Sequence, residues 1–278
     1  MWSNLNTFMS ESETTFVKLT SSDSWQPGNT FPVPNRGMNF GDGIFETMFF
    51  DGQKVRFADY HLARAKRGLE ILGIEAKDLN FPEMETLVSK TYSGQKIRVR
   101  WTLFRAGSGK YTPSQNSLCQ ILQLEGYSSP PPFKSHAGLG SSVVLHPSPI
   151  SSLKTLNGLS YILAAQERVR KGWDEIILLD SKRNIAEAGS SNIFWKNGNI
   201  VFTPGLGTGC IAGVGRAAIL SGFRDVGVEV REGYFSKDDL FKAELVWVSN
   251  ALGVSYLERF EFAEFSTEGF TPLEDIFK

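Results

Sequence analysis

The sequence has few of the residues on which several common kinds of site depend. Among its 278 residues there are two cysteines, Cys119 and Cys210, and they form no CxxC pair. This argues against a metal or redox pair and fits a reducing cytoplasm. Three histidines, His61, His136 and His146, show no HExxH or HxH spacing, so the sequence predicts no zinc or other metal site.

Other absences narrow the function further. The formal net charge is -1, so no overall field favours nucleic acid or an anionic membrane surface. No apolar run reaches the length of a membrane span, and the early acidic residues Glu11 and Glu13 are unlike the basic start of a secretory signal. The GxSxG and GxxxxGK[ST] patterns of serine hydrolases and P-loop proteins do not occur. We therefore expect a cytoplasmic protein that acts on small molecules.

The length of the chain and its proline- and glycine-containing segments predict two domains of mixed α and β structure (α+β), because 278 residues are too many for one small core. Residues 1–30, rich in Ser, Thr and Asn, are expected to form a loose arm. Three consecutive prolines lie in the segment 126–134 and favour an extended connector. The prediction is a small α+β domain over residues 31–125, a linker over 126–134 and a larger domain over 135–278.

Hydrophobic periodicity and turn residues place the elements. In the first domain they predict a hairpin around Asp51-Gly52, a helix capped by Asp59 and ended by Gly73, and paired strands over 96–107 and 117–127. The second domain is expected to hold strands over 141–147, 174–180 and 243–254, helices over 156–172 and 213–227, and a hairpin over 192–204.

The segment 209–220, GCIAGVGRAAIL, places three glycines at the start of a helix. Unpaired NH groups and the helix dipole favour an anion at such a position. Gly213, Gly215 and Ala218 also match the dinucleotide pattern GxGxxA, with Glu229 or Glu232 downstream. Because a loop separates these glycines from the preceding strand, a cradle for one phosphate is favoured over a dinucleotide site or a plain turn.

Three charged residues are candidates for chemistry, although each alone is also typical of a solvated surface. Lys154 precedes a predicted helix, and the positive end of a helix favours the free amine that a catalytic lysine needs. Glu187 lies among small and apolar residues, so a buried carboxylate there would need a cationic partner such as a protonated pyridine. Arg64 lies on the first helix beside other basic residues.

Read in order, the motifs of the chain resemble those of the class IV aminotransferases, also called fold type IV pyridoxal-phosphate enzymes. The resemblance runs from about Arg36 to Leu257 and rests on NRGMNFGDGIFET, HLARAKRGLEILGI, LKTLNGLSYILAAQE, DEIILLDSKRNIAEAGSSNIFW and VFTPGLGTGCIAGVGR. It implies a small α+β domain, a larger domain with a β-barrel-like sheet and helices, pyridoxal 5'-phosphate as cofactor, and a homodimer.

The resemblance also implies residue roles. Lys154 corresponds to the Schiff-base lysine, which also moves a proton, and Glu187 to the partner of the pyridine nitrogen. The implied phosphate contacts are Arg64, Val214, Gly215 and Asn250. The chain departs from the family at Ala212 and Gly215, where Pro and Thr are frequent, so a threonine hydroxyl contact to phosphate is missing.

The predicted reaction is transfer of an amino group between an amino acid and a 2-oxo acid. Elimination of pyruvate, as in aminodeoxychorismate lyase, is the alternative, because Thr47 matches a threonine associated with proton transfer in that lyase. FET in place of FEG, and no tyrosine directly after the lysine segment, argue against the branched-chain form. GDGxFE and KxLN also occur in D-amino acid aminotransferases.

Cationic groups are needed for the carboxylate of such a substrate. The candidates are Arg98, Arg105 and Lys110, with Tyr111 nearby, and for each of the charged residues a surface position is an equal alternative. Outside the family, the remaining hypothesis is a dinucleotide-binding protein with no covalently held cofactor.

Overall fold

The computed structural model describes residues 13–19, 24–28 and 33–278. It divides into two compact units, Met1–Ser128 and Ser129–Lys278, which are called the first and the second unit below. The division falls within the proline-containing segment 126–134. Among the described residues, none of the helices is long and apolar enough to pass through a bilayer.

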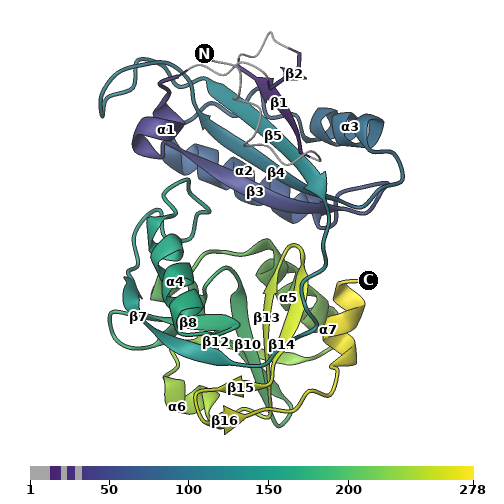
Figure 1. The fold of residues 1–278 in the computed structure, drawn as a ribbon, viewed down its shortest axis with the longest axis vertical. Coiled ribbons are helices and arrows are strands. Elements are labelled where there is room, and N and C mark those ends of the chain that lie inside the picture. The colour runs from purple at the N-terminus through teal and green to yellow at the C-terminus, as the bar shows by residue number, and fades with distance from the viewer. Residues whose placement is uncertain (1–12, 20–23, 29–32) are drawn as a thin grey trace, which may run out of the picture. The chain divides into compact units, whose positions relative to one another are not determined.

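The first unit is an antiparallel sheet, one face of which packs on the two longer helices of the unit (Figure 1). Its strands follow the order β2-β1-β5-β4-β3. Their bounds are β1 Thr14–Lys18, β2 Gln26–Pro27, β3 Gly43–Phe50, β4 Ile97–Arg105 and β5 Leu118–Gly126. The helices are α1 Arg36–Phe40, α2 Ala58–Leu72 and α3 Phe81–Thr91. The predicted strand pair is confirmed, because β4 and β5 pair over their whole length.

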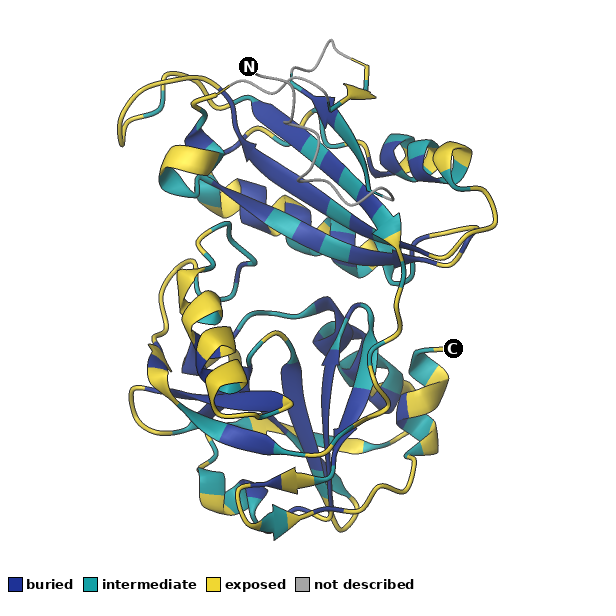
Figure 2. Cartoon of the chain, in the orientation of Figure 1, coloured by how far each residue is buried: buried dark blue, intermediate teal, exposed yellow. Residues whose placement is uncertain are grey.

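Alternation along β3 separates a core face from an outer face. Met48 is fully buried and packs with Trp101 of β4 and Leu69 of α2 in one apolar cluster. Thr47, its neighbour in sequence, points to the opposite face because successive strand residues alternate and is only half-buried. Figure 2 shows this alternation of buried and half-buried residues on β3.

Two sequence predictions in the first unit need correction. The turn at Asp51-Gly52 exists, but only one bridge, Phe50 to Val55, follows it, and β3 pairs instead with β4. The loose arm over residues 1–30 is wrong for β1, whose alternating Thr14–Lys18 segment pairs with the free side of β5. The rest of that predicted arm, apart from residues 13, 19 and 24–28, lies outside the described residues.

The second unit holds two sheets, ordered β12-β11-β10-β13-β14-β6 and β16-β15-β7-β8-β9. The strands of the first are β6 Phe133–Lys134, β10 Asn192–Asn197, β11 Ile200–Pro204, β12 Glu229–Gly233, β13 Leu245–Asn250 and β14 Gly253–Leu257. Those of the second are β7 Ala137–Leu145, β8 Glu175–Asp180, β9 Ile185–Ala188, β15 Arg259–Phe260 and β16 Ala263–Glu264. The helices are α4 Leu159–Arg170, η1 Leu206–Thr208, α5 Val214–Asp225, α6 Lys237–Leu240 and α7 Thr271–Ile276.

The inner faces of these two sheets form one core. Ile177 and Ile185 of one sheet pack with Trp195, Val246 and Leu257 of the other. The outer face of the longer sheet carries a second cluster, in which Phe223 of α5 lies edge-on to Trp247 of β13. The predicted helix at the glycine-rich segment and the hairpin at Asn197-Gly198 are both confirmed.

Candidate active site

Glu187 is a buried carboxylate in the second unit. It lies on β9 and is 4% exposed. The hydroxyl of Tyr161 donates to Oε1 at 2.6 Å, and the backbone NH of Ile211 donates to Oε2 at 3.1 Å. Burial raises the pKa of Glu187 to about 7, although both hydrogen bonds and the charge of Lys154 act to lower it. Such a carboxylate is stabilised by a nearby cation.

Lys154 lies in the loop between β7 and α4 and is half-buried. It is near enough to Glu187 for its charge to lower the pKa of that carboxyl. The predicted helix after it begins later than expected, at Leu159, five residues beyond the lysine. The charge of Lys154 therefore acts on Glu187, but the start of α4 is not directly beside Lys154 in the chain.

The glycine-rich segment leads into α5 and contacts the loop that carries Lys154. The NH of Ala212 donates to the carbonyl of Ser152 at 2.9 Å, which ties the segment to the Lys154 loop. Gly213 is the N-cap of α5, and no side chain caps the helix. The first-turn NH groups of α5 thus have no capping side chain.

Close packing explains two of the glycines. A Cβ at Gly213 would lie 2.3 Å from the Asn192 side chain, and a Cβ at Gly215 would lie 2.7 Å from the carbonyl oxygen of Asn250. Asn250 ends β13 and donates from its amide to Ser191 Oγ at 3.3 Å. Val214 and Gly215 are themselves buried at the mouth of α5. Gly215 and Asn250, both predicted phosphate contacts, therefore meet at one end of the sheet.

A buried hydroxyl lies beside this contact. Ser249 pairs across the sheet with Asn192 and is 1% exposed. Its Oγ has no hydrogen-bond partner among the described residues. A helix start without a capping side chain and an unsatisfied hydroxyl suit a group rich in acceptor oxygens, and the buried carboxylate suits a cationic ring nitrogen. The residues of the second unit therefore fit pyridoxal phosphate.

Arg64 lies in the first unit, on α2, in a buried charged cluster. Its guanidinium donates to both oxygens of Glu46, at 2.8 Å and 2.5 Å. His61 Nδ1 lies 2.6 Å from the same carboxylate. Burial acts to raise the pKa of Glu46, but Arg64 and His61 outweigh it and hold that pKa at about 2. Burial also lowers the pKa of His61. Glu46 thus fixes the position of Arg64.

Thr47 and Arg98 lie on the outer face of the first unit's sheet. Thr47 is paired with Arg100, and Arg98 is paired with Phe49. Arg98 forms an ion pair with Glu125 of β5 that is about one-third exposed on both sides. Because Glu46 lies on the core face, Thr47 and Arg64 belong to opposite sides of β3.

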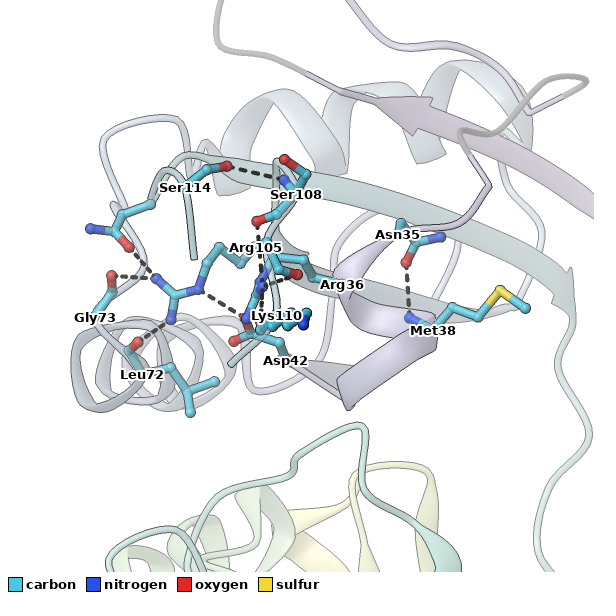
Figure 3. A network of polar contacts seen from close by, with 12 residues as sticks. Asn35, Arg36, Met38, Asp42, Leu72, Gly73, Arg105, Ser108, Lys110 and Ser114 are labelled. Carbon is cyan, nitrogen blue, oxygen red and sulfur yellow. Dashed lines mark hydrogen bonds and ion pairs between the residues drawn. The ribbon is translucent and has the colours of Figure 1, made fainter. Parts of the chain in front are cut away.

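Arg105 has a different environment from the other predicted substrate contacts (Figure 3). It is 7% exposed and donates to Asp42 at 2.9 Å, to Asn116 and to the carbonyls at the end of α2. Arg36 shares Asp42 at 2.7 Å and donates to the carbonyl of Lys110 at 2.7 Å. This cluster holds the loop between β4 and β5.

Lys110 and Tyr111 lie at the exposed part of that loop, and Tyr111 is 91% exposed. Its ring contacts Phe40 of α1, with centroids 5.8 Å apart. Lys110, Tyr111 and Arg105 are thus brought into one region of the first unit. Of the three side chains, only that of Arg105 is buried, with its guanidinium among protein acceptors.

Sequence reasoning missed several residues that organise these sites. Tyr161 and Ile211 hold Glu187, Glu46 holds Arg64, and Asp42 joins Arg36 to Arg105. The small and apolar residues around Glu187 in the sequence indicate burial, but they do not indicate which groups donate hydrogen bonds to its carboxylate. Within the described ranges, no group of three or more His, Cys, Asp and Glu side chains could hold a metal ion.

Comparison with known proteins supplies independent information. A profile described as amino-transferase class IV matches residues 43–256. Aminodeoxychorismate lyase of Bacillus subtilis is 27% identical over 259 residues, which cover 88% of this chain and 87% of that protein.

Solved structures match over nearly the whole chain. The branched-chain aminotransferase of Escherichia coli has a TM-score of 0.83 at 20% identity, covering 96% of this chain and 92% of its own. The 4-amino-4-deoxychorismate lyase of Pseudomonas aeruginosa has a TM-score of 0.80 at 22% identity, covering 94% and 97%. These likenesses confirm the predicted mixed α and β fold.

Proposed function

The chain belongs to the class IV aminotransferase family, and we propose that it is a pyridoxal-phosphate-dependent aminotransferase that moves an amino group between an amino acid and a 2-oxo acid. One observation carries the proposal. A lysine and a buried carboxylate with a raised pKa lie in one electrostatic site, beside the glycine-rich start of a helix. This combination matches the needs of a cofactor with an aldehyde, a ring nitrogen and a phosphate.

In this proposal Lys154 binds the cofactor covalently and Glu187 pairs with its pyridine nitrogen. Pyridoxal phosphate supplies an electron sink for the bonds at the substrate Cα. The amine of Lys154 would carry the proton from the substrate Cα to C4' of the cofactor, acting first as general base and then as general acid. Burial of Glu187 excludes water from the ion pair and strengthens it.

Within the second unit, the phosphate is assigned to the start of α5 and to Asn250 beside it; Arg64 of the first unit is the contact that the family resemblance adds. Backbone groups of Val214 and Gly215, the Asn250 side chain and the Arg64 guanidinium are the proposed contacts. The support is the meeting of Gly215 with Asn250 and the absence of a side-chain cap on α5. Glu46 holds the Arg64 guanidinium in one orientation through two hydrogen bonds.

The substrate carboxylate is assigned to Arg98, Lys110 and Tyr111. Arg98 is partly exposed, and Lys110 and Tyr111 are exposed. Arg105 has its guanidinium donors directed at Asp42, Asn116 and two backbone carbonyls. Its role in the proposal is therefore to hold the loop that carries Lys110.

We also propose that the protein forms a homodimer.

Elimination is the second candidate, and two observations favour it. Aminodeoxychorismate lyase of Bacillus subtilis aligns with 88% of the chain at 27% identity, and Thr47 is half-buried on the outer face of β3 rather than enclosed in the apolar core. In a lyase, Lys154 and Glu187 keep the same roles, and the Thr47 hydroxyl assists a proton transfer.

One experiment separates the two reactions. The purified protein is loaded with pyridoxal phosphate and mixed with a panel of L- and D-amino acids, and separately with aminodeoxychorismate. An aminotransferase converts the bound cofactor to its amine form and releases one equivalent of oxo acid. Production of pyruvate and aminobenzoate from aminodeoxychorismate, without turnover of any amino acid, would overturn the aminotransferase proposal in favour of the lyase.

A further inference from the structure

Tyr161 is the one side chain, among the described hydrogen bonds, that donates to Glu187. Its hydroxyl lies 2.6 Å from Glu187 Oε1. Tyr161 is on α4, seven residues after Lys154, so one chain segment carries both the tyrosine hydroxyl and the lysine charge that act on Glu187. The carboxylate is thus held between α4 on one oxygen and the Ile211 NH on the other.

The Tyr161 ring is fixed by packing. It lies against the apolar cluster that includes Val143, Leu145 and Ala164. The same residue lines a pocket of about 640 Å³ together with Arg168 and other residues of the second unit. The cluster packs against the ring, and the hydrogen bond to Glu187 holds the hydroxyl, so these two contacts set the direction of the side chain.

We propose that Tyr161 is a positioning residue that keeps Glu187 ionised and correctly oriented, so that the cofactor's ring nitrogen rather than Glu187 holds the shared proton. This inference rests on the proposed function. A carboxylate that accepts a strong hydrogen bond is less basic than one that does not. Without the hydroxyl, Glu187 would compete for the proton on the ring nitrogen, and the electron sink would weaken.

The other groups that face Glu187 do not replace this donor. Lys154 contributes charge, but in the proposed function its amine is bound to the cofactor. Burial and the Glu187 charge raise the pKa of Cys210 to about 11, so its thiol stays neutral. Burial and Glu187 also raise the pKa of Tyr161, so its hydroxyl remains a donor at any working pH.

The first test uses the protein without cofactor. Glutamate side-chain carboxyl carbons are labelled with ¹³C and titrated by NMR, and the Glu187 signal is the one absent from Glu187→Gln. Tyr161→Phe removes the hydroxyl and keeps the ring. We expect the Glu187 midpoint to rise by about one pH unit, because a hydrogen bond to a charged group is lost. An unchanged midpoint would overturn the inference.

The second test uses the loaded protein and separates binding from turnover. In Tyr161→Phe, kcat should fall about tenfold or more, whereas KM for the amino acid should change by less than about twofold, since the lost interaction matters mainly after the substrate is bound. The visible absorption band should keep its intensity but show a shifted pH dependence. A tenfold rise in KM for the amino acid, with kcat unchanged, would contradict a positioning role.

Tyr256→Phe is the matched control. Tyr256 lies in the same unit, and its hydroxyl accepts from the Phe270 NH at 2.9 Å and contacts Glu274 at 3.4 Å. It should leave the Glu187 midpoint and kcat unchanged. If Tyr161→Phe does not fold, the contact is followed from the tyrosine, labelled with ¹³C at Cζ. The Tyr161 signal should move as the pH passes through the Glu187 midpoint in wild type and should stay unchanged in Glu187→Gln; a signal that does not move in wild type would overturn the inference.

Failure of the proposed function would look different. A wild-type protein that forms no Lys154-dependent visible band with pyridoxal phosphate contradicts the cofactor assignment, while the NMR titration without cofactor still reports on Tyr161 and Glu187. A wild-type protein that forms the band, with a Tyr161→Phe variant identical to it in Glu187 midpoint and in kcat, contradicts the inference alone.

Discussion

Gly215 of α5 and the backbone of Asn250 are so close that a Cβ at position 215 would lie 2.7 Å from the Asn250 carbonyl oxygen. This contact sets the helix start against the end of β13. Because the clashing atoms belong to the backbone, they cannot move aside as a flexible side chain would. A glycine is needed there for packing, and no side chain caps the first NH groups of α5.

Gly215→Ala should therefore displace the start of α5. We expect a loss of about 1–3 kcal/mol of stability from the overpacked contact and a roughly tenfold or greater loss of affinity for pyridoxal phosphate, since 1.4 kcal/mol is a factor of ten. Thermal unfolding and a fluorescence titration with the cofactor measure the two effects. Gly205→Ala is the control, since its Cβ would meet nothing closer than 3.6 Å. Equal behaviour of both variants would contradict this account of Gly215.

Glu187 should make the stability of the cofactor-free protein depend on pH. Its pKa is about 7 in the folded protein against a usual 4.5, so its contribution is complete below about pH 4.5 and is lost as the pH rises through 7. The difference in unfolding free energy between wild type and Glu187→Gln should thus shift against wild type by on the order of 3 kcal/mol over this range.

Urea unfolding at a series of pH values measures that difference, because all other titrating groups are common to both proteins. Bound pyridoxal phosphate should abolish the dependence, since a cationic ring nitrogen stabilises the ionised carboxylate. Parallel pH profiles for the two cofactor-free proteins would show that Glu187 titrates normally and is not isolated from water.

Arg105 and Lys110 should separate into a structural and a substrate role. Arg105→Ala leaves Asp42 without one of its two arginine partners and should cost about 3–5 kcal/mol, seen as a lowered Tm. Lys110→Ala, at an exposed position, should change stability by less than about 0.5 kcal/mol and raise KM for the acid substrate. A normal Tm in Arg105→Ala together with a raised KM would assign that arginine to the substrate instead.

Thr47→Val distinguishes the two candidate reactions. The substitution keeps the shape of the side chain and removes its hydroxyl on the outer face of β3. If the protein is an aminotransferase, the rate with amino acids should stay within about threefold of wild type, because Lys154 performs the proton transfer. A loss of about a hundredfold in pyruvate release from aminodeoxychorismate, within the range of general acid-base catalysis, would instead support elimination.

Local sequence patterns predicted much of the fold. The alternation in β4 and β5, the helical period of α2 and the Asn197-Gly198 turn each depend on residues close in the chain, and each is found. The turn at Asp51-Gly52 was expected to join two paired strands, but β3 gains far more pairing from β4, some fifty residues later. Pairing at that distance leaves no local signal.

The candidate site likewise contains some residues that the sequence indicates and others that only the folded structure brings together. The order and spacing of motifs in the sequence lead to Lys154, Glu187 and the glycine-rich segment as candidates. Tyr161, Glu46 and the Arg36–Asp42–Arg105 cluster were missed, because each depends on a contact that only folding creates. A buried tyrosine hydroxyl and a surface one look identical in the sequence, and the burial of Arg105 has no periodic signature.

Borohydride reduction of the loaded protein tests whether Lys154 holds the cofactor. The protein is incubated with pyridoxal phosphate, reduced to make the link permanent, digested and mapped by mass spectrometry, with Lys154→Ala and the exposed Lys171→Ala treated in parallel. We expect a single labelled peptide that contains Lys154, absent from Lys154→Ala and retained in Lys171→Ala. Labelling at another lysine, or a violet absorption band that survives in Lys154→Ala, would contradict it.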